Sequence, residues 1–482
     1  MSHERSDAVP ATGTQSGATA VELAQRSTGV EEPVRNRGLV FAIVAMALFM
    51  AAVDGTIVAT ALSTIQHELG AGIAWSGWII TIYALGQILI MPLAGKLADM
   101  YGRKRVFLLA AVLFTTASLC CGLAGNIYVL VALRAVQAIG GGAFMPSASG
   151  IVSDHFGRDR DRALGMFSSI FPIGGIVGPV LGGIFVVTWS WRGIFLVNVP
   201  IGIALIILGL IFIPRGVARK GGRLDLIGVG LLAALLLGAM LGVTYLGSSG
   251  SSMLSAGFLV PEFVAVASGV GFVLHAKYAA APFIPLRLLY GRGFGVMNTI
   301  NLILGSAALG FGALVPLYAE DRFGIPVLQA GTLLTARAIG MILVAGMATM
   351  ALRRTGYRLP MVIGFSIVIV GLVGLSAVPQ SASPYWWLSI AGAVTGIGMG
   401  LAMPAANNAT MHLAPENIAA IAGLRGMFRQ GGGIISVSIV TAVLARSTDQ
   451  GFALAISFVV LACLLLAVMP LIALVPNHRG SW

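Results

Sequence analysis

The chain of 482 residues is 57% hydrophobic and only 10% charged, with a mean hydropathy of +0.95, whereas an ordinary soluble domain is about 25% charged. A chain this apolar could not cover its surface in water, so lipid is the expected solvent. The net charge of +12 suggests nucleic acid when taken alone, but the basic residues fall in short loops and form no stripe, so we expect a membrane protein without a nucleic-acid partner.

The first part of the chain, 1–37, is polar and lacks the apolar core of a secretory signal. Its composition predicts a disordered cytoplasmic tail. A spanning helix needs about 20 mostly apolar residues, and fourteen runs after the tail meet that length. They cover 39–62, 75–94, 106–124, 127–149, 164–187, 193–213, 224–247, 257–275, 294–319, 330–351, 359–378, 385–407, 418–445 and 451–475.

The basic residues indicate how these fourteen predicted helices are oriented. An even number of spans places both termini on one side of the membrane. With the N-terminus inside, most of the 29 Lys and Arg residues fall in inside segments, and only Arg192, Arg322 and Arg446 fall in outside segments. Cytoplasmic loops of membrane proteins are enriched in Lys and Arg, so the pattern predicts cytoplasmic N- and C-termini, the latter a short tail over 477–482.

The sequence offers no motif for enzymatic chemistry or for a cofactor. It contains no Walker A sequence, no H-E-x-x-H motif and no nucleophile elbow. Cys120, Cys121 and Cys463 lie in apolar runs and form neither a disulfide framework nor a zinc pattern. We therefore expect no enzyme, no metal site and no cofactor. A helix bundle without an energy-coupling domain favours a secondary transporter or a channel.

Asp54, in the run "FMAAVDGTIVATAL", is the only acid deep within a predicted span. Glu262 and Asp225 lie near the ends of theirs, where an acid is inexpensive. A charge at the bilayer centre costs about 2.5–3.5 kcal/mol on insertion scales, and intramembrane ionisable groups are therefore functional by default. Burial favours the neutral acid, so Asp54 could load and release a proton. Alternatively, it stays charged beside a cation or makes a structural hydrogen bond.

Arg134, in the fourth run, is the natural partner for Asp54. It lies roughly 10 Å from the outer end of its helix, and Asp54 lies roughly 12–16 Å from the outer end of the first helix. The two charges can therefore share a depth in the membrane. A nearby guanidinium favours the ionised carboxylate, so movement of Arg134 would switch the proton affinity of Asp54.

Other polar residues within the runs are candidates for a substrate cavity. Arg337 either faces the cavity or extends its head group to the interface. Arg425 and Arg429 also fall within or at the edge of a helix. Each neutral candidate could instead bridge two helices. The remaining candidates are Trp78, Tyr83, Gln87, Gln137, Asn298, Asn301, Asn407 and Asn408.

Several stretches over about 38–475 resemble the fourteen-helix drug:proton antiporters of the major facilitator superfamily. "VDGTIVATALSTI" is similar to the first-helix pattern D-x-T-I-V-x-x-A-L-P, with Ser63 at the proline position. "GKLADMYGRKR" resembles the motif between the second and third helices, with Met100 where arginine is frequent. Its matching residues are Gly95, Asp99, Gly102, Arg103 and Lys104.

Further segments extend the resemblance along the chain. "LRAVQAIGGG" is similar to the fourth-helix R-x-x-Q-G motif, with Ala138 in place of glycine, and "WRGIFLVNVPIG" matches the connection between helices 5 and 6. "LRGMFRQGGGIISVSIV" resembles the R-Q-x-G-G segment, with Arg429 and Gln430. "GGIVGPVLGG" is similar to a fifth-helix antiporter motif whose residues here are Gly174, Gly178, Pro179, Gly182 and Gly183.

The resemblance implies an all-helical membrane protein with 14 transmembrane helices. Two six-helix pseudo-symmetric bundles, 38–214 and 291–476, would be separated by two inserted helices in 215–290, and rocking of the bundles would give alternating access. Arg134 would act in proton coupling, and the loop residues, the fifth-helix glycines and Arg429 in conformational gating. For the fifth helix, simple packing is an equally good explanation.

The expected function is proton-driven antiport that exports lipophilic, cationic drugs or toxic compounds, although Arg337 leaves anionic or zwitterionic cargo open. The partners would be a small drug-like molecule, protons and the lipid bilayer, for a monomer in a bacterial inner membrane. One alternative is export of an endogenous metabolite, lipid or siderophore. A proton-independent facilitator or channel, and a receptor or scaffold without any flux, are the others.

Overall fold

The structure is a computed structural model that describes residues 36–70, 73–214, 225–246, 252–280, 282–291, 293–414, 418–444 and 447–477. Nearly all of the two predicted tails therefore lies outside the described residues. The part of the chain that is described is helical almost throughout and contains no strand.

The helices follow one another with short connections. The first seven are α2 (Arg37–Glu68), α3 (Ile73–Tyr101), α4 (Arg103–Gly122), α5 (Ile127–His155), α6 (Arg160–Thr188), α7 (Gly193–Leu196) and α8 (Asn198–Phe212), with the 3-10 turn η1 (Gly157–Asp159) before α6. The next three are α9 (Leu226–Leu246), α10 (Ala256–Tyr278) and α11 (Leu286–Tyr290). The last are α12 (Phe294–Phe323), α13 (Val327–Thr355), α14 (Arg358–Ser376), α15 (Pro384–Met411), α16 (Ile418–Leu444), α17 (Gln450–Val468) and η3 (Met469–Leu474).

Each of the fourteen apolar runs coincides with a long helix, except that α7 and α8 together form the run 193–213. Within the described residues, ten segments are long and apolar enough to cross a membrane, and three further helices contain shorter apolar segments. The protein is therefore an all-helical, multi-pass membrane protein. The number of fourteen crossings stays a prediction.

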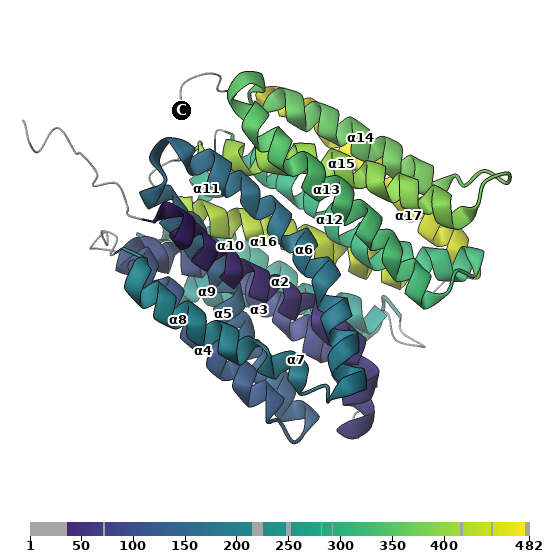
Figure 1. The fold of residues 1–482 in the computed structure, drawn as a ribbon, viewed down its shortest axis with the longest axis horizontal. Helices are drawn as coiled ribbons and strands as arrows, with labels where there is room; N and C mark the ends of the chain where they lie inside the picture. Colours follow the sequence, from purple (N-terminus) through teal and green to yellow (C-terminus); the bar gives the residue numbers. More distant parts are fainter. Residues whose placement is uncertain are drawn as a thin grey trace, which may run out of the picture.

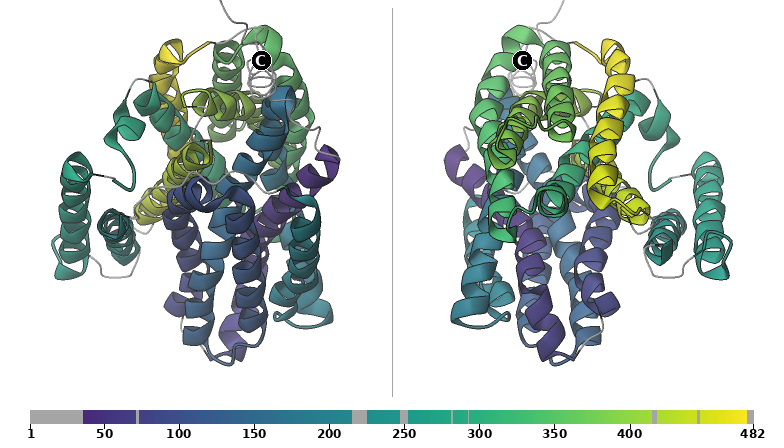
Figure 2. Two further views of the ribbon diagram at one scale, coloured as in Figure 1. Left: turned by 90° about the vertical axis from the view of Figure 1, so that its left-hand side faces the viewer. Right: turned by 90° about the vertical axis from the view of Figure 1, so that its right-hand side faces the viewer.

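Figure 1 shows two groups of helices: α2–α8, purple to teal, and α12–α17, green to yellow. Each group has its own apolar core, one around Phe114 and Phe144 and the other around Phe365 and Phe458. Helices α9 and α10 pack against each other at the side of the body (Figure 2). The expected limits of the two bundles remain a prediction.

Helix α16 is the main element at the boundary between the two groups. It packs against α12 of its own group and against α3 and α5 of the first group. Its residues Ile421, Leu424 and Met427 belong to the apolar core of the first group. The boundary between the groups therefore runs along α16, and side chains on this helix experience any separation of the two groups.

Helices α2 and α6 approach closely along the glycines of the fifth-helix motif. A Cβ atom on Gly178 would lie 2.0 Å from the hydroxyl oxygen of Thr56, and one on Gly182 would lie 2.1 Å from that of Thr60. The Thr56 hydroxyl donates a hydrogen bond to the Gly174 carbonyl over 3.2 Å. Helices in lipid associate through such close packing of small residues. The motif thus packs two helices of one group, and its role in gating remains a prediction.

Gly178→Val is therefore expected to destabilise the protein, because overpacking of a tight contact costs typically about 1–3 kcal/mol. Gly183→Val is the matched control, since a Cβ atom on Gly183 would meet nothing within 4 Å. The apparent melting temperature in detergent, measured by size-exclusion chromatography after heating, should fall for Gly178→Val alone. Equal melting temperatures for the two variants would contradict the packing role.

Candidate functional site

Asp54 and Arg134 form an ion pair in the interior of the first group of helices. Asp54 lies near the middle of α2, and its side chain is fully buried; Arg134 lies on α5 and is 1% exposed. The Arg134 Nη1 atom is 2.6 Å from the Asp54 Oδ2 atom. The sequence placed these residues at a common depth, and the structure brings them into contact.

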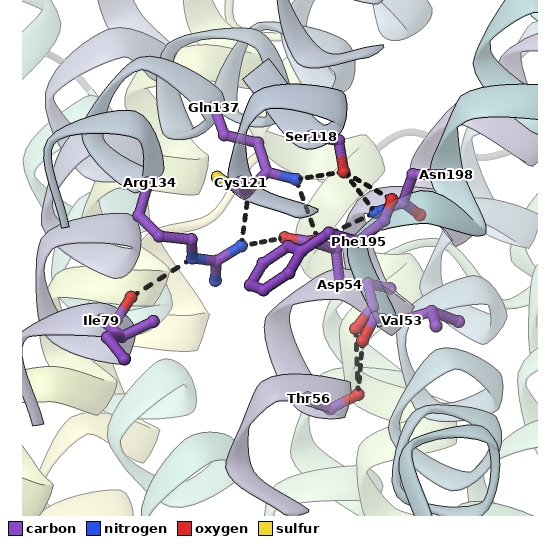
Figure 3. A network of polar contacts seen from close by, with 11 residues as sticks. Val53, Asp54, Thr56, Ile79, Ser118, Cys121, Arg134, Gln137, Phe195 and Asn198 are labelled. Carbon is purple, nitrogen blue, oxygen red and sulfur yellow. Dashed lines mark hydrogen bonds and ion pairs between the residues drawn. The ribbon is translucent and has the colours of Figure 1, made fainter. Parts of the chain in front are cut away.

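Two amides and a hydroxyl complete the network around the carboxylate (Figure 3). Gln137 Nε2 and Asn198 Nδ2 each donate to Asp54 Oδ1, over 2.9 and 3.0 Å. Both amides also donate to Ser118 Oγ, whose hydroxyl donates to the Phe195 carbonyl over 2.9 Å. Four helices, α2, α4, α5 and α8, thus contribute side chains to one site, and both carboxylate oxygens accept hydrogen bonds.

Further contacts orient the guanidinium of Arg134. Its Nε atom donates to the Ile79 carbonyl over 3.3 Å, and Nη1 donates to Gln137 Oε1 over 2.8 Å. Its Cζ atom lies 3.9 Å from the centroid of the Tyr83 ring, a cation–π distance. The Tyr83 hydroxyl is buried and makes no hydrogen bond. Arg134 therefore keeps partners on α3 and α5 even without the carboxylate.

This arrangement suits a carboxylate that exchanges an ion pair for a proton. As an ion, Asp54 is matched by Arg134 and by the two amide donors. When it is protonated, it loses the charge interaction with Arg134, which can still use the Gln137 and Ile79 oxygens. The cost of desolvating either state is thus offset by neighbours already in place.

Sequence reasoning missed Asn198 and Ser118 as members of this site. Asn198 is the only polar side chain in the stretch "IFLVNVPIG", and a lone amide in an apolar run is a signal that could have identified it. Ser118 gave no such signal, because a hydroxyl can satisfy itself on its own helix. Gln137, expected at the substrate cavity, is part of the Asp54 network, and its place in a cavity stays a prediction.

Of the other predicted cavity residues, Tyr83 lies against Arg134, and those on the second group of helices make contacts elsewhere. Asn298 donates to the carbonyls of Leu288 and Leu289 in α11, and Asn301 donates to its own helix and to Thr410. Asn298 and Asn301 therefore bridge helices, which is the other role that the sequence left open for them.

The remaining candidates lie on other helices. Trp78 is half-buried on α3, Asn407 is buried on α15 and Arg429 is half-buried on α16. The Arg337 Nη2 atom lies 3.1 Å from the sulfur of Met399. Their place in a cavity stays a prediction.

Gln87 makes a contact that joins the two groups. Its Oε1 atom accepts a hydrogen bond from Gln430 Nε2 of α16 over 3.1 Å. Gln87 lies four residues after Tyr83, so both side chains are on one face of α3. Tyr83, whose ring lies over Arg134, and Gln87, which bonds to α16, therefore share one face of α3.

The loop motif between α3 and α4 holds the start of α16. Asp99 Oδ2 accepts a hydrogen bond from the backbone N–H of Ala420 over 3.3 Å, at a helix N-terminus that favours negative charge. A Cβ atom on Gly95 would lie 2.4 Å from the Ala419 carbonyl oxygen, so only glycine allows this approach. Gly102 makes the turn into α4 with a φ of 97°. Asp99 and Gly95 thus link the two groups of helices.

Basic residues of the same motif make contacts within the first group. Arg103 donates to Asp99 over 3.3 Å, to the Gly150 carbonyl over 2.6 Å and to Asp154. Lys104 Nζ donates to the Leu210 carbonyl at the end of α8 over 2.7 Å. Arg103 therefore orients the carboxylate that contacts α16, while Lys104 ties α4 to α8.

A second link at the same end joins α6 to α15. Asp161 Oδ2 is 3.0 Å from His412 Nε2, and Asn408 Nδ2 donates to the Asp161 backbone carbonyl over 3.1 Å. Arg160 Nε also lies 3.2 Å from Asp161 Oδ1. Together with the Asp99 contact, these bonds hold the groups together at the end that carries the predicted cytoplasmic loops.

The Asp161 link has a defined pH dependence. Burial works to raise the pKa of Asp161, but the hydrogen bond with His412 and the charges of His412 and Arg160 outweigh it and leave this pKa below its usual value. The ionised group therefore contributes stability that is complete above the ordinary aspartate pKa of about 3.9 and is lost as the pH falls through the lower folded value. The melting-temperature advantage of wild type over Asp161→Asn should be largest near pH 7 and should shrink below about pH 4. Asp321→Asn, at an exposed position on α12, should lower the melting temperature little at any pH.

Comparisons with known proteins agree with this architecture. The Major Facilitator Superfamily profile matches residues 44–437 and, in a second match, 300–482. The chain is 29% identical over 411 residues to the multidrug transporter protein MdtP of Bacillus subtilis, covering 83% of this chain and 74% of that protein. It is 28% identical over 384 residues to the riboflavin transporter RibZ of Clostridioides difficile, covering 78% and 81%. The solved structure of the proton:xylose symporter XylE superposes with a TM-score of 0.64 at 14% identity, over 92% of this chain and 96% of that one.

Two groups of membrane helices that meet along one boundary, with a buried ion pair inside, define a membrane transporter. The chain belongs to the Major Facilitator Superfamily. Its expected role as a transporter of small molecules rather than an enzyme follows from that membership and from the transporters among its relatives.

Proposed function

We propose that this protein is a proton-driven antiporter that exports lipophilic compounds across a bacterial membrane. The observation that carries the proposal is the fully buried Asp54–Arg134 pair with its amide partners. A charged pair costs several kcal/mol to desolvate, and intramembrane charges generally mark ion or proton pathways. The name of the multidrug relative supports drug-like compounds as cargo.

The contacts between the groups suggest how protonation would be coupled to movement. The bonds of Asp99 and Asp161 join the two groups at the end that carries the predicted cytoplasmic loops. Surface ion pairs contribute only about 0–1 kcal/mol each, so several weak bonds can hold one state without trapping it. A proton on Asp54 would loosen α5 from α2, and α3, which carries both Tyr83 and Gln87, would pass the change to α16 at the boundary.

The test is dye accumulation in everted membrane vesicles from cells that express the protein. An imposed proton gradient should drive accumulation of a lipophilic dye, and a protonophore should abolish it. Vesicles from cells carrying an empty vector are the control. Flux that is insensitive to the protonophore would favour a facilitator instead, and the absence of any flux would favour a receptor or scaffold.

A second candidate is export of an endogenous metabolite by the same machinery. One relative is named as a riboflavin transporter, which is compatible with such a cargo. If no drug-like dye moves, but deletion of the protein abolishes secretion of a native compound, this candidate is correct.

A further inference from the structure

Arg425 is a buried cation that the site around Asp54 does not use. It lies on α16, and only 2% of its surface is exposed. Its Nε atom has no hydrogen-bond partner, and none of the ion pairs found among the described residues involves it. Sequence reasoning gave this residue no role. A guanidinium this deeply buried is normally paired with a carboxylate or held by several acceptors.

The nearest residues to Arg425 along α16 are apolar or of the same charge. Its neighbours in sequence, Leu424 and Met427, are buried in the core of the first group. Arg429 follows four residues later, so it lies on the same face of α16, where it is a second positive charge. The Oε1 atom of Gln430, the residue after Arg429, is buried and accepts no hydrogen bond. The boundary between the groups is therefore positive at this point.

The carboxylate of Asp54 does not balance this charge, because Arg134 already neutralises it at 2.6 Å. A guanidinium cannot release its proton in a protein, and an unpaired buried charge is strongly destabilising. The expectation of cationic cargo depended on Asp54 being available to the cargo. With Asp54 matched, the positive charge of Arg425 stays uncompensated at the boundary between the groups.

We propose that Arg425 is the anchor for an anionic oxygen group, a carboxylate or phosphate, on a lipophilic cargo bound beside α16 at the boundary between the groups. The proposal rests on the transport function above and specifies its substrate class. The guanidinium offers a planar pair of donors that matches a carboxylate or phosphate. The apolar core residues on either side of it accommodate the lipophilic part. When the groups separate, Arg425 becomes accessible and the anion replaces the missing partner.

The probe pair for the test is rhodamine B, which carries a free carboxylate, and its ethyl ester, which lacks that negative charge on the same ring system. Fluorescence polarisation with the full chain in nanodiscs of neutral lipid measures the affinity for each dye without a proton gradient. Wild type should bind rhodamine B more tightly than the ester. Arg425→Gln should weaken rhodamine B binding about tenfold or more, the loss expected for a charge-assisted hydrogen bond, and should leave the ester unchanged.

Two further variants separate an anion site from a structural role. Arg425→Lys keeps the charge and should retain part of the preference for rhodamine B. Arg287→Gln, at an exposed position on α11, should bind both dyes like wild type. Equal wild-type affinities for the two dyes, or equal losses for both dyes in Arg425→Gln, would overturn the proposal. If phosphatidylglycerol added to the nanodiscs competes with rhodamine B, the result supports the anion site and identifies a membrane lipid as a source of the anionic group.

The two proposals fail in different experiments. If the dye preference depends on Arg425 but no gradient drives accumulation in vesicles, the anion site stands and proton-driven export is wrong. If the gradient drives accumulation of both dyes and Arg425→Gln does not change their ratio, export stands and the anion site is wrong.

Discussion

Asp54→Asn is expected to reduce gradient-driven dye accumulation in everted vesicles to the level of vesicles without the protein. Asparagine has almost the same shape as aspartate and can still accept hydrogen bonds from Gln137 and Asn198. It cannot take up or release a proton in the relevant range, however, so the step that links cargo to the gradient is lost. Dye counterflow, which needs no proton gradient, should continue because the helices can still rearrange.

The matched control is Glu68→Gln, an equivalent substitution at the C-terminal end of the same helix. Glu68 accepts hydrogen bonds from Trp191 and Arg192, and its side chain is 48% exposed. It lies outside the buried network, so accumulation should stay near the wild-type rate. Full gradient-driven accumulation in Asp54→Asn, at equal protein levels, would refute proton coupling through this carboxylate.

Arg134→Ala is expected to be the most destabilising single change in the site. It leaves the Asp54 carboxylate buried with amide donors alone, and removal of one partner from a buried pair costs about 3–5 kcal/mol. It also removes the contact with the Tyr83 ring and the bond to the Ile79 carbonyl. The apparent melting temperature in detergent should fall sharply, with a smaller fall for Asp54→Asn.

A double-mutant cycle separates the charge from the packing in this prediction. In Arg134→Ala with Asp54→Asn, no charge remains stranded, so the double variant should be more stable than Arg134→Ala alone. Transport should remain absent, because the proton acceptor is gone. If the effects of the two substitutions on stability simply add, the pair does not interact in the way that the 2.6 Å contact implies.

The positions of the helices could be predicted from the sequence, whereas helix interruptions and the partners of polar side chains could not. The helix positions could be read from the runs, because lipid requires every spanning segment to be long, apolar and internally hydrogen-bonded. The 193–213 run could not be divided into α7 and α8, because a helix interruption leaves hydropathy unchanged. The sequence could not show that the asparagines on α12 bridge helices, because an amide in an apolar run has the same sequence signature whether it bridges helices or lines a cavity.

By itself, the sequence predicted a helical membrane protein, favoured a transporter, and placed Asp54 and Arg134 as charges at a common depth, because charges within apolar runs are rare and their depth follows from the rise per residue. The tertiary structure alone decided which side chains surround them. Asn198 and Ser118 come from helices far apart in the chain, and the deep burial of Arg425 without an ion pair among the described residues is visible only in the fold. Such facts depend on how helices rotate and cross, and hydropathy carries no information about rotation.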